Sequence, residues 1–266
     1  MYPHDLIFDV GVCDGADSAY YLTQAHRVVG VEASPVACKA LRERFATEIA
    51  EGRYVLVEAG IAEAPGELTF WVCHEHPEWS SFDKALTERE GNTQTAVTVQ
   101  ARTFASVIEE FGIPDFCKID IEGHDIVCLK HLTPETAPAY LSVELAHEMG
   151  DILIAELRRL GYGDYKVISQ RTLSPVQPEL TGFIYGLKNP KLKGFLRRVD
   201  QKLRGARWDG NWRFPFASSG AFGEKTPGRW YSADRAFKNW QFLRDVDHRY
   251  NGAGLDDWFD VHVRKA

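Results

Sequence analysis

The sequence predicts an α/β protein built on a mostly parallel β-sheet, and two features of the first 187 residues indicate this fold class. Short apolar runs of β-type residues alternate with stretches of helical periodicity, which is the pattern of a parallel sheet covered by helices. The chain of 266 residues, 44% hydrophobic and 26% charged, has the length and composition of one globular α/β domain with an appendage.

The predicted strands are apolar runs such as YVLVE at 54–58. They are expected at residues 5–11, 27–32, 54–58, 68–73, 96–101, 115–121, 139–145, 165–169 and 181–187. Helices are expected near residues 17–26, 34–50, 103–111, 123–131 and 151–160. The helix at 34–50 has the clearest start, because Ser34 caps an N-terminus and Pro35 fits the first turn.

Two parts of this region depart from strict alternation. The polar stretch 75–95 is predicted to be a loop between two extra strands. The last two runs, 165–169 and 181–187, lie close enough in sequence to form an antiparallel hairpin that closes the sheet.

The character of the chain changes after Asn189 and Pro190. Five of the seven tryptophans fall in the last 59 residues, among glycine, proline and arginine, and only residues 232–249 have helical periodicity. This stretch has too little patterned apolar sequence for a core of its own. We therefore expect residues 1–187 to form a cofactor-binding domain, and residues 188–266 to be a basic, Trp-rich C-terminal extension packed on it.

Charge is distributed unevenly along the chain. Residues 1–187 carry 14 basic and 29 acidic side chains, whereas residues 188–266 carry 17 basic and 9 acidic ones. An acidic protein, with a net charge of −7, is not expected to bind nucleic acid in general. The basic tail can attract phosphate, an acidic glycan or a membrane surface, or it can dock on its own acidic domain.

The sequence also bears on the compartment. No apolar stretch reaches the roughly 18 to 20 residues of a membrane-spanning helix, and the first residues do not have the pattern of a secretory signal. The five cysteines are odd in number and contain no C-x-x-C pair, which argues against a disulfide framework or a structural zinc site. We therefore expect a cytoplasmic protein without a transmembrane segment.

The end of the first strand, DVGVCDG, has the features of a ligand-binding turn. Gly11 and Gly15 allow a tight turn and a close approach of a ligand, because they have no Cβ atom. Ligands of an open parallel sheet bind outside the carboxyl ends of its strands. Glu32 ends the second strand, where a carboxylate can accept hydrogen bonds from both hydroxyls of a ribose. Together these residues predict a pocket for an adenosine-containing cofactor, although the glycines alone can serve only to shape the turn.

The spacing of the glycines separates two classes of cofactor. Dinucleotide binding favours G-x-G-x-x-G, with a pyrophosphate at a helix N-terminus. Here the pattern is D-x-G-x-x-x-G, and Asp9, Asp14 and Asp17 lie around it. Negative charge would repel a pyrophosphate, but it suits the amino and sulfonium groups of S-adenosyl-L-methionine (SAM). A nicotinamide-dependent oxidoreductase is therefore the less favoured alternative.

Two further strand ends carry ionisable residues. Alternation places Lys118, Asp120 and Glu122 on one face at the end of the fourth strand, and such residues are costly there unless they are used. Glu144 and His147 end the fifth strand. These residues are candidates for catalysis, and a salt-bridged strand end is the structural alternative for the first three.

The order of these motifs resembles the FkbM family of SAM-dependent methyltransferases. The motifs are DVGxxxG, VVGVEASP, the pair Ser80-Ser81, CKIDIEGHD and SVEL, and they span about residues 5–187. The resemblance implies a Rossmann-like class I methyltransferase with a seven-stranded, mostly parallel sheet, whose last hairpin supplies the one antiparallel strand. It also implies O-methylation of a hydroxyl on a sugar, glycan or natural product, with SAM as the cofactor.

The resemblance and the strand-end pattern give a set of candidate residues. Those expected to bind the cofactor are Asp9, Gly11, Asp14, Gly15, Glu32, Ala33 and Asp120. Those expected to act in catalysis are Asp120, Glu144 and His147, with Glu122 beside them at the reacting edge. No metal ligand is predicted, because no ligand spacing fixes a metal site, although the acidic residues offer oxygen ligands. The partner is expected to be a small-molecule or glycan acceptor; a homo-oligomer and a catalytically inactive SAM-binding module remain open.

Overall fold

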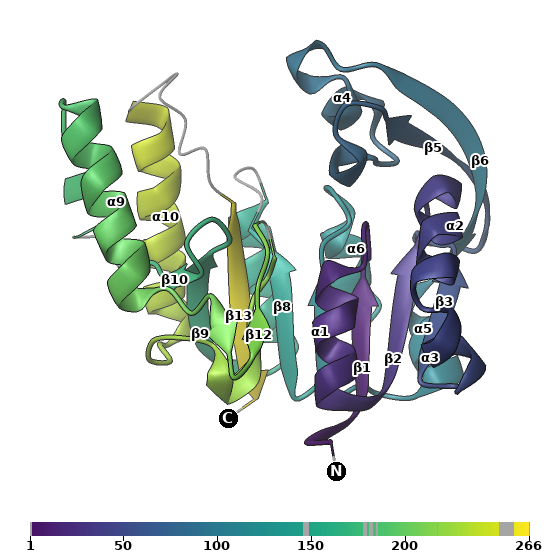
Figure 1. Cartoon of the computed structure of the whole chain (residues 1–266). Helices are drawn as coiled ribbons and strands as arrows, with labels where there is room; N and C mark the ends of the chain where they lie inside the picture. The colour runs from purple at the N-terminus through teal and green to yellow at the C-terminus, as the bar shows by residue number, and fades with distance from the viewer. Residues whose placement is uncertain are drawn as a thin grey trace. The chain divides into compact units, whose positions relative to one another are not determined.

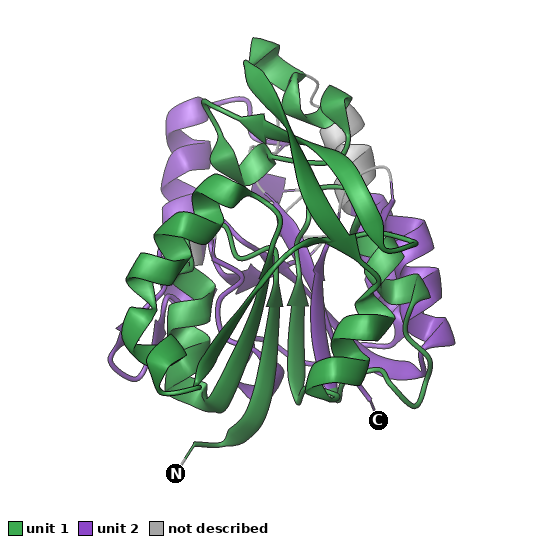
Figure 2. Ribbon diagram, turned by 90° about the vertical axis from the view of Figure 1, so that its right-hand side faces the viewer, with its two compact units in different colours: residues 1–139 green, residues 140–266 purple. Residues whose placement is uncertain are grey.

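The computed structural model describes residues 2–145, 149–177, 180, 183–184, 186–216, 218–249 and 258–265. The chain divides into two compact units, unit 1 at residues 1–139 and unit 2 at residues 140–266, drawn in green and purple in Figure 2. Within the described residues, no helix has both the length and the apolar character needed to cross a bilayer.

Unit 1 is built on a parallel sheet with the strand order β7-β1-β2-β3 (Figure 1). Its strands are β1 (His4–Val10), β2 (Ala25–Glu32), β3 (Tyr54–Glu58) and β7 (Phe116–Ile119). The helices that connect and follow them are α1 (Ala16–Gln24), α2 (Pro35–Arg44), α3 (Ala46–Ala50), α5 (Phe104–Phe111) and α6 (Asp125–Lys130). The alternation of strands and helices that predicted an α/β fold with a mostly parallel sheet is confirmed.

The strands of unit 1 form because their apolar residues fill the core. Ile7, Phe8 and Val10 of β1 are fully buried, as expected for a central strand of a parallel sheet. The start of α2 is also as predicted, since the Ser34 hydroxyl accepts a hydrogen bond from Ala37 N at 3.4 Å. The predicted helix at 34–50 is two helices, which are separated at Phe45.

A second, three-stranded sheet in unit 1 has the order β4-β6-β5. The strands are β4 (Gly60–Ile61), β5 (Gly66–Cys73) and β6 (Gln94–Arg102), which confirms the two extra strands that the sequence predicted. The segment between β5 and β6 was expected to be a loop, but it contains the short helices η1 (Pro77–Trp79), α4 (Lys84–Thr87) and η2 (Arg89–Gly91). Helix α4 begins where the Asp83 carboxylate caps Ala85 N at 2.8 Å.

Unit 2 contains a sheet with the order β10-β9-β13-β8. Its strands are β8 (Tyr140–Glu144), β9 (Tyr162–Ser169), β10 (Ser174–Pro175) and β13 (Phe259–Lys265). A separate pair is formed by β11 (Trp208–Asp209) and β12 (Trp212–Arg213). The helices are α7 (Gly150–Arg159), α9 (Pro190–Arg204), η3 (Gly223–Lys225) and α10 (Ala233–Arg249), the last of which confirms the helix expected at 232–249.

Among the described residues, the sheet of unit 2 has two antiparallel strands, the short β10 beside β9 and the longer β13, and β13 comes from a different segment than the sequence predicted. β13 lies between β8 and β9 and runs antiparallel to both, so the predicted hairpin of 165–169 with 181–187 is wrong. Of the described residues of the second run, Phe183, Ile184 and Gly186 are helical, and Leu187 is in neither a helix nor a strand. Phe259 in β13 is 3% exposed, whereas in the second run Phe183 is 61% exposed and Ile184 is 5% exposed.

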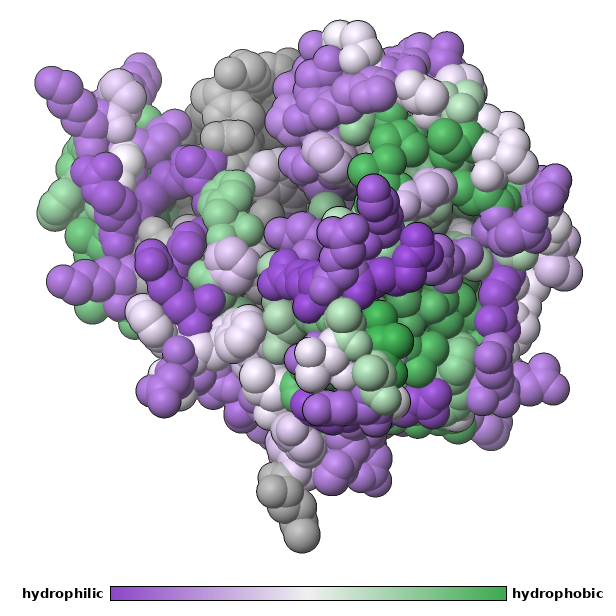
Figure 3. Space-filling view, turned by 45° about the vertical axis from the view of Figure 1, so that its right-hand side comes forward, coloured by the Kyte–Doolittle hydropathy of each residue, from purple (hydrophilic) through white to green (hydrophobic). Residues whose placement is uncertain are grey.

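The C-terminal residues therefore belong to the core of unit 2. The two compact units of the structure meet in the chain after residue 139, within the stretch 1–187 that the sequence predicts to be one domain. The predicted domain boundary at residue 187 stays a prediction. Hydrophilic side chains cover most of the face shown in Figure 3, as expected for a chain with 26% charged residues.

Candidate active site

Three loops of unit 1 meet at the carboxyl ends of β1, β2 and β7. Gly11 N, at the end of β1, donates a hydrogen bond to Val31 O of β2 at 2.9 Å. Asp120 N, just after β7, donates to Val10 O at 2.9 Å. The turn after β1 is thus held between its two neighbouring strands, where an open parallel sheet binds its ligands.

The two glycines of this turn are required by the backbone itself. Gly11 has φ +87°, and a Cβ atom there would lie 1.7 Å from Asp120 O. Gly15 has φ +80°, and its Cβ would lie 2.7 Å from the Phe45 ring. Only glycine satisfies both the left-handed backbone and the close packing. The structural reason for these glycines is therefore established, and their contact with a cofactor stays a prediction.

Glu32 joins two of the loops. Its side chain is buried, with Oε2 accepting a hydrogen bond from Cys13 N at 2.9 Å and Oε1 accepting one from Ser34 N at 2.7 Å. Burial raises the pKa of Glu32, and the backbone donors oppose that rise. A carboxylate oxygen accepts more than one hydrogen bond, so Glu32 retains acceptor capacity for a further donor. Ala33, the next residue, is half-buried.

A cluster of charges lies between β1 and β7. Lys118 Nζ is 3.5 Å from Asp120 Oδ2, 3.7 Å from Asp9 Oδ1 and 3.8 Å from Asp17 Oδ2. It also donates a hydrogen bond to Gly11 O at 3.2 Å. One ammonium group thus lies near three carboxylates, so the cluster has more hydrogen-bond acceptors than its one ammonium group can satisfy. Lys118 was predicted on this edge, and its position among the aspartates follows from the register in which Asp9 pairs with Lys118.

Asp9 is the most deeply buried member of this cluster. Its Oδ2 accepts a hydrogen bond from the Ser18 hydroxyl at 2.6 Å, and that hydroxyl lies 3.2 Å from the Tyr54 hydroxyl oxygen. Burial raises the pKa of Asp9 to about 7, and the positive charge of Lys118 opposes the rise. The protonation state of Asp9 therefore affects the stability of the folded protein.

The loop after β7 is shaped by its own carboxylate. Asp125 accepts hydrogen bonds from Ile121 N at 3.1 Å and from Gly123 N at 3.3 Å. Glu122 and Gly123 both have left-handed backbones, with φ of 48° and 90°. A non-glycine residue with positive φ is strained, and such strain is often found at functional sites. The side chain of Asp120, at the start of this loop, remains 25% exposed.

The segment between β5 and β6 packs against this loop. The Ser81 hydroxyl donates a hydrogen bond to Glu122 O at 2.8 Å, and Arg89 Nη2 lies 3.1 Å from Glu122 Oε2. The Arg89 guanidinium also stacks 4.0 Å from the centre of the Trp79 ring. Burial and the charge of Asp120 raise the pKa of Glu122 to about 8, and Arg89 opposes this. Ser81 belongs to the serine pair identified in the sequence, whereas Arg89 and Trp79 belong to no motif and were not predicted.

The structure also describes most of the other ionisable residues at the strand ends. Asp14 is exposed in the turn and caps Ala16 N at 2.8 Å, at the start of α1. Glu144 ends β8 in unit 2, where it is half-buried and pairs in register with Asp260. His147 lies outside the described residues. His124 packs its ring against Phe82, with the ring centres 5.2 Å apart, and burial lowers its pKa.

Comparison with known proteins identifies a family. The methyltransferase FkbM domain family matches residues 9–163, a range that includes every loop of the site in unit 1. No curated protein matches the chain.

Three solved structures illustrate the similarity in fold, each at low sequence identity. Methyltransferase FkbM from Methylobacillus flagellatus KT is 18% identical, with a TM-score of 0.44, and the match covers 64% of this chain but only 40% of that one. Precorrin-6y C5,15-methyltransferase from Geobacter metallireducens GS-15 is 13% identical over 64% of this chain and 69% of its own, with a TM-score of 0.39. An O-methyltransferase from Bacillus cereus in complex with SAH is 12% identical over 99% and 75% of the two chains, with a TM-score of 0.33.

Proposed function

Because this chain belongs to the FkbM methyltransferase family, we propose that it is a SAM-dependent O-methyltransferase that acts on a hydroxyl of a sugar, glycan or natural product. The observation that carries the proposal is a group of carboxylates at the carboxyl ends of β1, β2 and β7 in unit 1. This group, here called the acidic rim, consists of Asp9, Asp17, Glu32 and Asp120. The family favours a methyltransferase over the nicotinamide-dependent alternative, and a turnover assay distinguishes an active enzyme from an inactive SAM-binding module.

The chemistry of the rim fits SAM. SAM supplies a methyl group on a positively charged sulfur, together with an amino group and two ribose hydroxyls, and carboxylates attract or accept all of these. Asp9, Asp17 and Asp120 outnumber the single cation Lys118, and Glu32 keeps acceptor capacity. We propose that Glu32 holds the ribose and that the turn at Gly11 and Gly15 holds the methionine part.

For the transfer itself we propose Asp120 as the residue at the reacting edge. The acceptor oxygen must lie in line with the methyl group and lose its proton, and a carboxylate within hydrogen-bond reach assists both. The side chain of Asp120 is partly exposed, whereas the Glu122 carboxylate is engaged by Arg89. Glu144 and His147 remain the alternative bases.

The acceptor class rests on the tail. Aromatic rings stack on sugars, and arginines pair with carboxylate or phosphate groups. Trp208 is 62% exposed, and the Arg213 guanidinium lies 5.9 Å from its ring centre, farther than the cations beside Trp230. Trp230 is not comparably available, because Lys166 Nζ and the Arg264 guanidinium lie 4.0 and 4.8 Å from its ring centre. We propose that Trp208 contributes to acceptor binding. The five free cysteines, four of them buried, favour a reducing compartment, and we propose the cytoplasm.

The direct test is methyl transfer with isotope-labelled SAM and a panel of sugars, glycans and hydroxylated natural products. The proposal predicts label in an alkali-stable ether, loss of that label in Asp120→Asn, and weaker saturation by acceptor in Trp208→Ala. Label on nitrogen or carbon would contradict O-directed transfer. A chain that binds SAM but labels no member of the panel would favour the inactive module.

A further inference from the structure

Helix α9 of unit 2 has two chemically different sides. Asn189 fixes its start, since its side-chain oxygen accepts hydrogen bonds from Lys191 N at 3.0 Å and Leu192 N at 3.2 Å. Apolar residues recur at intervals of three and four along the helix and so share one face. This apolar face consists of Leu192, Phe195, Leu196, Val199 and Leu203.

The apolar face is turned to solvent. Leu203 is 77% exposed, Phe195 is 54% exposed and Leu192 is 44% exposed, while Leu196 and Val199 are half-buried. An amphipathic helix on a globular protein normally buries this face against the core. Contiguous exposed apolar surface of this kind marks a site of interaction.

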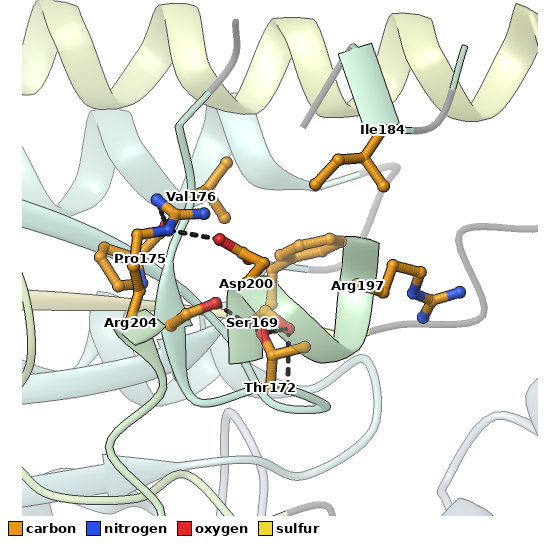
Figure 4. Close-up of a pocket in the computed structure, with 10 residues that line it drawn as sticks. Ser169, Thr172, Pro175, Val176, Ile184, Arg197, Asp200 and Arg204 are labelled. Atoms are coloured by element: carbon orange, nitrogen blue, oxygen red, sulfur yellow. Dashed lines mark hydrogen bonds and ion pairs between the residues drawn. The ribbon is translucent and has the colours of Figure 1, made fainter. Parts of the chain in front are cut away.

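Polar contacts of another side of the helix hold it in this orientation. Arg204 forms an ion pair with Asp200 and donates a hydrogen bond to Pro175 O at 3.3 Å. Asp200, Arg204 and Arg197 also line a small pocket, partly open to solvent, beside the hydroxyl-rich turn after β9 (Figure 4). Arg204 thus attaches the end of α9 to Pro175 of β10, while its ion pair with Asp200 lies within the helix, and the side chains of Leu192, Phe195 and Leu203 face outward.

The charge beside the apolar face is strongly positive. Helix α9 contains six basic residues and one acidic residue, a net charge of +5. Lys191, Arg198 and Lys202 are exposed. A helix with an apolar face flanked by lysine and arginine is the pattern of a segment that lies in the interface of an anionic bilayer. We propose that α9 docks this protein on an anionic lipid surface, with its apolar face among the acyl chains and its cations at the headgroups.

Two other occupants fit the face less well. A second copy packed on α9 through a twofold axis would bring two helices of net charge +5 together, and like charges in an interface oppose association. Nucleic acid would engage the cations but would leave the exposed leucines in water. An anionic bilayer satisfies both the charge and the apolar side chains.

The test is co-sedimentation of the full chain with vesicles. Vesicles of equal parts phosphatidylglycerol and phosphatidylcholine should bind the protein, and vesicles of phosphatidylcholine alone should not. The charge variant Lys191→Glu, Arg198→Glu, Lys202→Glu should lower partitioning by at least about a hundredfold, because each cation contributes about fivefold near an anionic surface. The matched control, Lys39→Glu, Lys130→Glu, Lys238→Glu, makes the same charge change at exposed lysines elsewhere and should keep most of the binding.

The apolar contribution is tested separately. Leu203→Ser and Phe195→Ser change exposed side chains and should fold normally, as circular dichroism would verify, yet each should weaken binding about tenfold. Val36→Ser, at a residue that is 71% exposed on α2, is the control and should have no effect. Failure of the parent to bind, equal binding to both vesicle types, or equal losses in variants and controls would overturn the proposal. Lipid-independent dimers that Leu203→Ser dissociates, or tight binding to duplex DNA alone, would assign the face to those partners instead.

Discussion

Replacing Glu32 should destabilise the protein as well as weaken cofactor binding. The buried Glu32 carboxylate accepts hydrogen bonds from Cys13 N at 2.9 Å and Ser34 N at 2.7 Å. Hydrogen bonds to a charged group contribute about 1.5 to 3 kcal/mol each. Glu32→Ala should therefore lower the free energy of unfolding by at most about 3 to 6 kcal/mol, because removing the carboxylate also relieves the cost of burying it, which raises its pKa.

A second substitution at Glu32 and a control at Glu58 test this expectation. Glu32→Gln keeps one acceptor oxygen but turns an NH2 group toward the other backbone donor, so it should lose about half as much, roughly 1.5 to 3 kcal/mol. Glu58 is the matched control, because it pairs in register with Glu32 at the end of the neighbouring strand. Its exposed ion pair with Arg42 contributes at most about 1 kcal/mol, so Glu58→Ala should be nearly neutral.

The assay is urea unfolding followed by circular dichroism, together with calorimetric titration of S-adenosylhomocysteine. If Glu32→Ala unfolds within about 1 kcal/mol of the parent, the two hydrogen bonds do not stabilise the loops as the structure indicates. The ribose assignment is tested independently with Glu32→Gln, at a temperature where it is folded. That variant should bind S-adenosylhomocysteine at least about tenfold more weakly, and parental affinity would contradict the assignment.

Three other predictions follow from the same site. Gly11→Ala should lower the free energy of unfolding in urea by about 2 to 5 kcal/mol, because its Cβ would overlap Asp120 O and its backbone is left-handed. The control Gly52→Ala also has a left-handed backbone but open space around it, so it should cost about 1 to 2 kcal/mol. Equal losses in the two variants would refute the steric argument. Burial raises the pKa of Asp9 to about 7, so the folded state binds that proton more tightly than the unfolded state, and the stability it gives is lost as the pH rises from about 4 to about 7. Asp9→Asn should therefore gain up to about 4 kcal/mol on the parent between these pH values in paired denaturation curves, and a pH-independent difference would contradict this. Asp120→Asn should lower turnover about tenfold or more while S-adenosylhomocysteine affinity stays within a few fold, and unchanged turnover would move the role to another base.

The sequence predicted unit 1 well because its signals are local. Apolar runs, the Ser34-Pro35 helix start and the acidic strand ends are read within a few residues of each other. The parallel register then brings Asp9 beside Lys118, as alternation along the strands suggested. The contact of Arg89 with Glu122 joins residues 33 positions apart across an irregular segment, and no spacing rule indicates such a pair.

The sequence was misleading in unit 2 because strand pairing there depends on long-range contacts. β9 pairs with β13, which begins about ninety residues farther along the chain, rather than with the nearer run at 181–187. The sequence FDVHVRK does alternate, but its polar positions read as a surface strand. Asp260 and His262 are in fact only 2% exposed. A deletion of 205–266 would remove this central strand, so point variants such as Trp208→Ala are the better test of the tail.

Hydrogen–deuterium exchange with and without S-adenosylhomocysteine tests the central claim most directly, because it reports binding and location together. We expect slower exchange in peptides that cover residues 9–18, 30–36 and 118–125 of unit 1, with no change in α9. Slower exchange confined to other segments, or no change at saturating S-adenosylhomocysteine, would contradict the assignment of the cofactor to these three loops.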